Sequence, residues 1–231
     1  MRETTTATLQ ITDVAKSFGK VQALKQISFD VKAGEVHGFV GENGAGKSTL
    51  MAVCSGALAP TSGEVRINGQ LIDADPEKVR ALGLAIVRQH PALMPDLTVA
   101  ENLYLGVPED KRPAMTRLEA WSEELLKAWD ETVTMQPSDR VNSLNPEQLF
   151  IVEIVKALAC DPQILVLDEP TEHLAQEDAQ RLFDRIKEQR DEGVAIVYIS
   201  HRIRDVQEIS DRLTVLRDGE GQGTYDAKSQ T

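Results

Sequence analysis

Nine consecutive residues of the chain could bind phosphate. Residues 41–49 match the pattern G-x-x-x-x-G-K-[ST], with an apolar run ending at Val40 before them and Leu50 and Met51 after them. In this strand–loop–helix context, glycines let backbone N–H groups point inward, and the following helix contributes the positive end of its dipole. The residues of this predicted cradle are Gly41, Glu42, Asn43, Gly44, Ala45, Gly46, Lys47, Ser48 and Thr49.

Two side chains of this loop have a chemistry of their own. Lys47 can reach the outer phosphates of a nucleotide, and the Ser48 hydroxyl can ligate Mg²⁺. A Gly-rich turn that binds nothing is the alternative. The Lys-Ser-Thr sequence and the preceding strand favour the phosphate site.

Further polar groups follow three predicted buried strands, at residues 84–87, 164–167 and 194–199. These groups are Gln89, Asp168, Glu169 and His201. Ligands of parallel α/β sheets gather outside the carboxyl ends of the strands, so we expect these side chains to meet the phosphate loop at one edge. This convergence is more specific than any one motif.

The expected roles follow from the chemistry of each group. Asp168 would hold Mg²⁺, which takes only one or two protein carboxylates alongside nucleotide phosphates. Glu169 would polarise an attacking water, and His201 would stabilise charge on the γ-phosphate. The alternatives are a solvated strand end for Asp168-Glu169 and a structural role for His201; their places after apolar strands favour function.

The elements that position these groups predict an α/β protein. Strands alternate with helices, which indicates a largely parallel sheet, and residues 164–167 are uniformly apolar, as in a strand buried on both faces. Two alternating segments joined by the turn Ser17-Phe18-Gly19-Lys20 predict an antiparallel flank. A helical insertion is expected between about residues 98 and 142.

Local signals predict the individual elements. We expect helices at 47–57 and 176–189, a hairpin at Asn68-Gly69, a helix capped at Asp75-Pro76, capping boxes at 98–101, 116–119 and 145–148, and a strand at 213–217 followed by the turn Asp218-Gly219 and a polar tail. Trp121 and Trp129 fall at helical spacing and are expected in the core.

Composition limits the classes of protein to consider. With 231 residues and no evident linker, the chain is expected to form one domain over 1–231, and its net charge of −12 argues against nucleic acid as a partner. No apolar run approaches the roughly 18 residues of a membrane span. Cys54 and Cys160 are expected to be reduced core thiols of a cytosolic protein, and the segment beginning Met1-Arg2-Glu3 a frayed leader.

Taken together, these residues resemble the nucleotide-binding domains of ABC transporters. Phe18 looks like the aromatic A-loop residue that stacks on adenine, residues 41–49 like Walker A, and Gln89 like the Q-loop glutamine, which would also contact Mg²⁺. Residues 164–169 resemble Walker B with its catalytic glutamate, and His201 the switch histidine. The resemblance covers essentially the whole chain and implies a P-loop ATPase that uses ATP and Mg²⁺.

The resemblance is strongest to sugar importers of the ribose, xylose and galactoside type. It rests on residues 97–103, 152–158 and 198–202. In that subfamily two such domains commonly lie in tandem on one polypeptide, and this chain is similar to the first half. The resemblance implies an ATPase on the inner face of the cell membrane, with a second ABC domain and a membrane permease as partners and a periplasmic or extracellular solute-binding protein as an indirect one.

The sequence departs from the family pattern at two places. The signature, normally Leu-Ser-Gly-Gly-Gln, here has Asn145, Pro146, Glu147 and Gln148 after Leu144. Asn145 and Gln148 remain candidate contacts to the nucleotide of the other subunit, but Pro146 lacks an N–H and Glu147 adds negative charge. The D-loop has Glu-His-Leu-Ala at 172–175 in place of Ser-Ala-Leu-Asp. We therefore expect two unequal ATP sites.

The predicted function is ATP hydrolysis that powers import of a small solute, a monosaccharide. Residues 89–103 either dock on the permease or pack between subdomains. Two alternatives remain: an ATP-binding regulatory half with little turnover, and an ABC ATPase that acts outside transport. The intact Glu169 and His201 disfavour the first, and the acidic composition disfavours the second.

Overall fold

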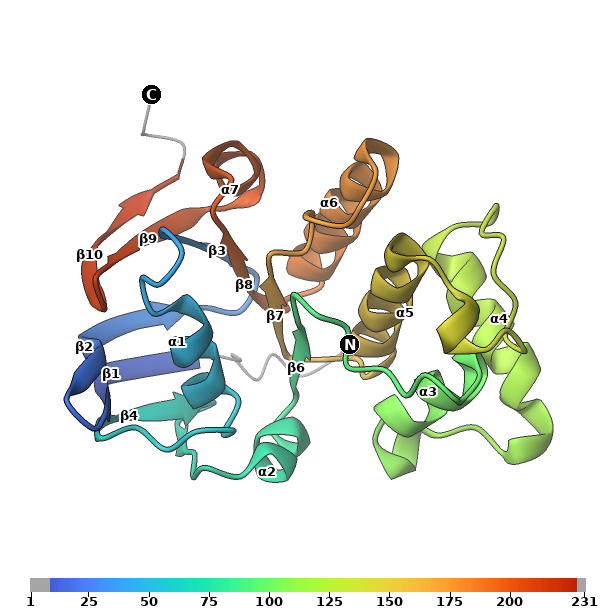
Figure 1. The fold of residues 1–231 in the computed structure, drawn as a ribbon, viewed down its shortest axis with the longest axis horizontal. Helices are drawn as coiled ribbons and strands as arrows, with labels where there is room; N and C mark the ends of the chain where they lie inside the picture. The colour runs from blue at the N-terminus through green and yellow to red at the C-terminus, as the bar shows by residue number, and fades with distance from the viewer. Residues whose placement is uncertain (1–8, 228–231) are drawn as a thin grey trace.

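The computed structural model describes residues 9–227, so the frayed leader expected at the N-terminus lies outside the described residues. Two β-sheets and the helices around them make up this part of the chain (Figure 1). The antiparallel sheet lies at one end of the view and the helices α3, α4 and α5 lie at the other. The predicted α/β class is confirmed.

The larger sheet carries the strands whose ends the sequence singles out. Its order is β10-β9-β3-β8-β7-β6, and all neighbours are parallel except β10, which runs antiparallel to β9 at the edge. The strands are β3 Val36–Val40, β6 Leu84–Val87, β7 Ile164–Asp168, β8 Ala195–Ser200, β9 Arg212–Arg217 and β10 Glu220–Asp226. Every residue of β8 is buried, as expected where both faces are covered.

The predicted antiparallel flank is a separate four-stranded sheet of order β2-β1-β4-β5. Its strands are β1 Leu9–Phe18, β2 Val21–Val31, β4 Ser62–Ile67 and β5 Gln70–Leu71. The Asn68-Gly69 turn joins β4 to β5 as predicted, with Asn68 at φ 51° and Gly69 at φ 77°. Leu9, Ile11 and Val14 of β1 are buried in a core cluster shared with the parallel sheet, which is why this flank stays attached.

Helix α1, Lys47–Cys54, begins at the phosphate loop and fills the space between the sheets. Leu50 and Val53 pack in one core cluster with residues of both sheets. A second core cluster, on the other face of the parallel sheet, joins α5 to its neighbours. The remaining helices are α2 Pro76–Ala81, α3 Val99–Gly106, α4 Leu118–Trp129, α5 Pro146–Ala159, α6 Gln176–Asp191 and α7 Ile203–Ile209, with 3₁₀ turns at Glu109–Lys111, Met115–Arg117 and Val141–Ser143.

The predicted helical insertion contains α3 and α4, which pack on each other and on α5. Trp129 is buried in the core and Trp121 is packed against it at the edge, as the helical spacing indicates. A capping box opens α3, where Thr98 accepts from the Glu101 N–H and Glu101 accepts from the Thr98 N–H. Buried Asn102 hydrogen-bonds both the N–H and the C=O of Met94, so the preceding loop is fixed to this helix.

Four local predictions are wrong or incomplete. No capping box forms at 116–119, because Thr116 lies inside a 3₁₀ turn and Arg117 stands at the N-cap without a side-chain hydrogen bond. Helix α1 ends at Cys54 rather than at 57 because Gly56 turns the chain at φ 70°. The expected polar tail contains β10, whose residues are all exposed and therefore show no apolar alternation. Helix α7 was not predicted.

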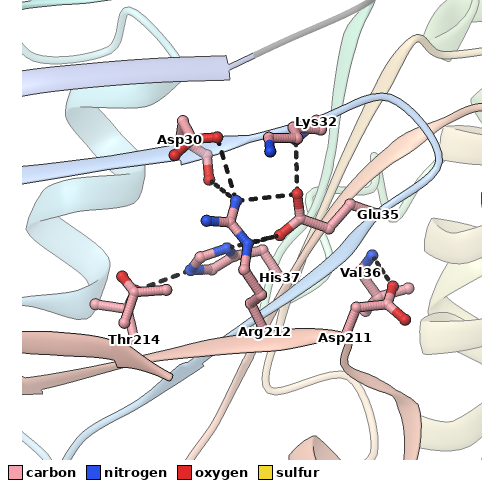
Figure 2. Close-up of polar contacts among 9 residues, drawn as sticks. Asp30, Lys32, Glu35, Val36, His37, Asp211, Arg212 and Thr214 are labelled. Atoms are coloured by element: carbon pink, nitrogen blue, oxygen red, sulfur yellow. Dashed lines mark hydrogen bonds and ion pairs between the residues drawn. The ribbon is translucent and has the colours of Figure 1, made fainter. Parts of the chain in front are cut away.

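A polar cluster lies at the amino end of β3, opposite to the phosphate loop (Figure 2). Glu35 accepts from the Arg212 guanidinium at 2.7 and 3.0 Å and from the Lys32 N–H at 3.0 Å, and the Arg212 side chain also reaches Asp30 at 3.2 Å. His37 places Nδ1 3.2 Å from Glu35 and Nε2 2.8 Å from Thr214. These contacts link β2, β3 and β9 at the end of the sheet opposite to the phosphate loop.

The hydrogen bonds of this cluster determine which ring nitrogen of His37 carries the proton. An ionised carboxylate only accepts, so His37 carries its proton on Nδ1 and donates to Glu35. Burial alone would raise the pKa of Glu35, but the hydrogen bonds from His37, Arg212 and Lys32 outweigh it and lower the pKa to about 2. Phe29 and Phe39 pack on the His37 ring, with centroids 5.6 and 5.4 Å away. The Glu35–His37 pair is therefore charged on one side and packed against aromatic rings on the other.

No helix among residues 9–227 is long and apolar enough to cross a membrane. Both cysteines are free thiols. Cys54 lies in the core as predicted, where burial raises its pKa to about 12. Cys160 is only half-buried, at the end of α5.

Candidate functional site

A cavity of about 210 Å³ lies at the carboxyl edge of the parallel sheet. Eleven of the predicted site residues line it: Glu42, Asn43, Gly44, Gly46, Lys47, Ser48, Thr49, Gln89, Asp168, Glu169 and His201. Ala23 and Glu172 line it as well and were not predicted as site residues. The structure thus gathers the ends of β3, β6, β7 and β8 around one opening, as the strand topology indicates.

The phosphate loop has the backbone shape that its glycines permit. Gly44 and Gly46 have φ of 85° and 105°, conformations that L side chains rarely adopt. A Cβ on Gly46 would lie 2.8 Å from the Ala23 carbonyl oxygen, whereas one on Gly44 would meet nothing within 4 Å. The loop therefore packs tightly against β2 on one side and stays open on the other, as a cradle for an anion needs.

Lys47 lies folded along this loop. Its Nζ donates to the Gly41 carbonyl at 2.6 Å and to the Glu42 carbonyl at 3.3 Å, and it lies 3.7 Å from Glu169 Oε1. The Lys47 side chain is 8% exposed, so it places a largely buried positive charge in the lining of the cavity. That is where the outer phosphates of a nucleotide would need a cation.

The turn between β9 and β10 supports the loop from behind. The Gly219 N–H donates to the Ala45 carbonyl at 3.0 Å, and the Lys25 N–H donates to the Gly219 carbonyl at 2.7 Å. Gly41 lies so close to Leu216 that a Cβ there would be 2.5 Å from its carbonyl oxygen. The C-terminal hairpin and β2 thus fix the position of the loop.

Asp168 ends β7, and Glu169 follows it with φ of 50°. Such a left-handed conformation costs a non-glycine residue about 1–3 kcal/mol, and it is found most often at functional sites. It aims the Glu169 carboxylate at His201, which donates through its N–H at 3.1 Å and has Nδ1 2.9 Å from Oε2. The carboxylate is 7% exposed and the histidine side chain 48% exposed.

Negative charge is crowded at this end of the sheet. Burial raises the pKa of Asp168, and the nearby Glu169 and Glu172 carboxylates raise it further, against the opposing effect of Lys47 and Arg88. A bound cation would relieve this repulsion. The crowding is therefore a property that a cation-dependent site would have.

The oxygen groups present fit Mg²⁺. Ser48 offers a hydroxyl, Asp168 a carboxylate and Gln89 an amide oxygen, and all three side chains line one cavity. Residues 9–227 contain no group of three or more His, Cys, Asp or Glu placed to hold a metal by themselves. Mg²⁺ in nucleotide sites takes one or two carboxylates and completes its shell with phosphate and water, so this donor set suits it.

Gln89 is held by a residue that was not predicted to belong to the site. Its Nε2 donates to Glu172 Oε2 at 2.8 Å. Glu172 begins the 172–175 segment, whose departure from the family pattern is visible in the sequence. The sequence signal therefore marked the residue but not its contact with Gln89.

Five predicted nucleotide contacts do not line the cavity: Phe18, Gly41, Ala45, Asn145 and Gln148. Gly41 and Ala45 belong to the phosphate loop and contact the residues behind it, Leu216 and Gly219. Phe18 ends β1, half-exposed, with the Lys16 ammonium 5.3 Å from its ring centroid. Asn145 and Gln148 form the capping box of α5, each accepting from the backbone N–H of the other.

Comparison with known proteins identifies the family. The family model described as ABC transporter matches residues 24–172, more than half of the chain. The chain belongs to the ABC transporter family. Relatives of this ABC chain include the ribose import ATP-binding protein RbsA 3 of Rhizobium meliloti (strain 1021), 45% identical over 91% of the chain. A putative ribose/galactose/methyl galactoside import ATP-binding protein of the same organism is 43% identical over 93% of the chain.

Solved structures of ABC cassettes share the fold. A dimeric ATP-binding cassette in a post-hydrolysis state, bound to ADP and Pi, matches with a TM-score of 0.85 and 27% identity, covering 95% of this chain and 99% of that one. The predicted P-loop ABC ATPase fold is confirmed. Each of the two Rhizobium relatives is longer, and this ABC chain covers 42% of its length.

Proposed function

We propose that this chain is the ATP-binding and ATP-hydrolysing part of an ABC importer for a monosaccharide. The observation that carries the proposal is the single cavity that holds the phosphate loop, Asp168, Glu169 and His201 together. The sugar is inferred from the relatives, whose names specify ribose and galactose import. The chain would act at the inner face of the cell membrane, in the cytoplasm, with a solute-binding protein outside.

In this proposal the phosphates of ATP lie in the loop formed by residues 41–49. Lys47 would exchange its carbonyl contacts for phosphate oxygens, and the N-terminus of α1 would add its backbone N–H groups. Ser48, Asp168 and Gln89 would hold Mg²⁺, which supplies charge neutralisation on the phosphates. Phe18 would stack on adenine at the β1 end.

Hydrolysis would depend on the Glu169–His201 pair. The Glu169 carboxylate is buried, fixed by two hydrogen bonds from His201, and therefore oriented before a water arrives. It would accept a hydrogen bond from the attacking water, while the exposed side of His201 would face the charge that develops on the γ-phosphate. General base catalysis of this kind contributes about 10²–10⁴ in rate.

The second ABC domain would complete the ATP site of this chain with its own signature segment. In return, residues 145–148 of this chain would complete the ATP site of the second domain, but only weakly. Pro146 at N1 of α5 has no N–H, and Glu147 Oε1 accepts from the Ala175 N–H at 2.7 Å within the same chain. The start of α5 is thus satisfied internally. Losing one charge-assisted hydrogen bond to the partner's nucleotide would cost about 1.5–3 kcal/mol, roughly 10–100-fold.

The permease would dock in a different cavity, of about 400 Å³, between α2, β6 and the helices α3 and α5. Arg80 and Arg88 line it and supply positive charge. Exposed Met94 and Leu105 lie at the same cavity. This chemistry fits a short permease segment with an acidic and an apolar side chain.

Arg80→Glu should abolish co-purification with the permease; undiminished co-purification would refute the docking.

The proposed ATPase is tested in the assembled transporter. Glu169→Gln should reduce ATP hydrolysis and sugar uptake by about 10²–10⁴, whereas the same change at the equivalent glutamate of the second domain should leave most of the hydrolysis intact. The reverse result would assign hydrolysis to the other site. It would favour a regulatory half that binds ATP with little turnover, the alternative that the altered signature keeps open.

A further inference from the structure

The Glu172 carboxylate fixes which end of the Gln89 amide points toward it. A glutamine amide has an NH₂ donor at one end and an oxygen acceptor at the other, whereas an ionised carboxylate only accepts. The contact of 2.8 Å between Gln89 and Glu172 therefore requires the NH₂ group to point at Glu172. The amide oxygen is left on the opposite side of the same planar group.

The backbone that carries Glu172 is held on both sides. The Glu172 N–H donates to the Glu169 carbonyl at 3.2 Å, in the turn that follows β7. Next to it, the Thr171 hydroxyl donates to Asp205 of α7 at 2.7 Å, and the Ala175 N–H donates to Glu147 at 2.7 Å. Because these anchors come from different parts of the fold, the backbone at Glu172 has a defined place relative to the cavity.

We propose that Glu172 is a positioning residue that orients the Gln89 amide oxygen toward the divalent cation of the nucleotide site. The inference rests on the proposed function, since it needs a bound Mg-nucleotide. Gln89, Ser48, Asp168 and Glu172 line one cavity, and an amide oxygen turned away from Glu172 would be available to a cation held there by Ser48 and Asp168. Outer-shell carboxylates that orient a ligand typically change metal affinity by about 10–100-fold when removed.

The opposite role is chemically distinct. A Glu172 that withheld Gln89 from the cation would make the site bind Mg²⁺ more tightly once it was removed. A Glu172 that acted only through its negative charge would be replaced poorly by glutamine. If Glu172 orients Gln89, its removal should weaken Mg²⁺ binding, and glutamine should replace it well. The amide oxygen of a glutamine can still accept from the Gln89 NH₂ group.

The test measures the Mg²⁺ concentration needed for the full chain to bind a fluorescent ATP analogue. Glu172→Ala should raise the midpoint about tenfold, and Glu172→Gln should restore most of the wild-type value. Gln89→Ala should raise it as well, and adding Glu172→Ala to that variant should have no further effect. Glu177→Ala, which removes the same charge from an exposed position outside the cavity, is the matched control and should leave the midpoint unchanged.

Three results would overturn the inference while leaving nucleotide binding by the wild type intact. They are an unchanged or lower midpoint for Glu172→Ala, equal defects for Glu172→Ala and Glu172→Gln, and an undiminished effect of Glu172→Ala when Gln89 is already alanine. Failure of the wild-type chain to bind the analogue at any Mg²⁺ concentration would instead refute the proposed function.

Discussion

Two glutamate–histidine pairs lie at opposite ends of the parallel sheet, and they differ in how completely their charges are satisfied. Glu35 and His37 lie at the amino end of β3, with Nδ1 to Oε1 at 3.2 Å; Glu169 and His201 lie at the carboxyl ends of β7 and β8, with Nδ1 to Oε2 at 2.9 Å. His37 is fully buried and both ring nitrogens have partners (Figure 2). His201 is 48% exposed.

The surroundings of the two carboxylates explain the difference in role. Arg212 binds Glu35 through two nitrogens, and the pKa of Glu35 falls to about 2. At the other end, burial and the neighbouring Glu169 raise the pKa of Asp168. The first cluster is balanced and stabilises the fold. The second lies beside Asp168, where negative charge is crowded; that crowding costs stability and suits a site that takes a cation.

The largest expected effect is on the rate of ATP hydrolysis, which should depend on the Glu169–His201 pair and not on the Glu35–His37 pair. Glu169→Gln should reduce hydrolysis by the assembled transporter about 10²–10⁴-fold, because it removes the proposed base but keeps the side-chain shape. Equilibrium binding of ATP should persist. Glu35→Gln serves as the control and should retain the hydrolysis rate per folded molecule. Equal losses in the two variants would erase the functional distinction between the pairs.

The next effect separates the histidines by stability. His37→Ala should lower the free energy of unfolding by about 3 kcal/mol, because it removes a buried ring between Phe29 and Phe39 and takes one hydrogen-bond partner from Thr214 and one from Glu35. His201→Ala should change it by only about 0.5 kcal/mol. Urea unfolding of both variants measures this. A comparable loss for His201→Ala would show that the exposed pair is structural as well.

A smaller effect depends on pH. The pKa of Glu35 is about 2 in the folded protein against a usual 4.5, so its ionised form stabilises the fold above about pH 4.5, and this contribution is lost as the pH falls toward 2. The stability gap between wild type and Glu35→Gln should therefore narrow by about 1 kcal/mol between pH 7 and pH 4. A gap that stayed constant over this range in urea titrations would mean that the Glu35 charge contributes nothing.

Much of the fold followed from local sequence patterns. The apolar run at 164–167 predicted a strand buried on both faces, and the Asn145 capping box predicted the start of α5. Strand β10 could not be found this way, because all of its residues are exposed and its pairing with β9 depends on the turn at Asp218-Gly219. The capping pattern at 116–119 failed because a 3₁₀ turn competes locally with a side-chain cap.

The candidate site was predictable where a residue follows a buried strand. That rule brought Gln89, Asp168, Glu169 and His201 to one cavity with the phosphate loop. It could not find Glu172, which is exposed and reaches Gln89 across 83 residues of sequence. Nor could it find the Glu35–His37–Arg212 cluster, because hydrogen-bond partners that come from different strands leave no periodic signal in the sequence.

The Glu35–His37 pair stabilises the fold, whereas in the proposed function the Glu169–His201 pair serves catalysis and adds no stability. Urea unfolding of Glu35→Gln and Glu169→Gln at pH 7 tests this difference directly, since the two substitutions are chemically identical. Glu35→Gln should lose roughly 3 kcal/mol, the equivalent of its pKa shift from 4.5 to about 2. Glu169→Gln should unfold at the same or a higher urea concentration than wild type. A loss for Glu169→Gln as large as that for Glu35→Gln would contradict the account.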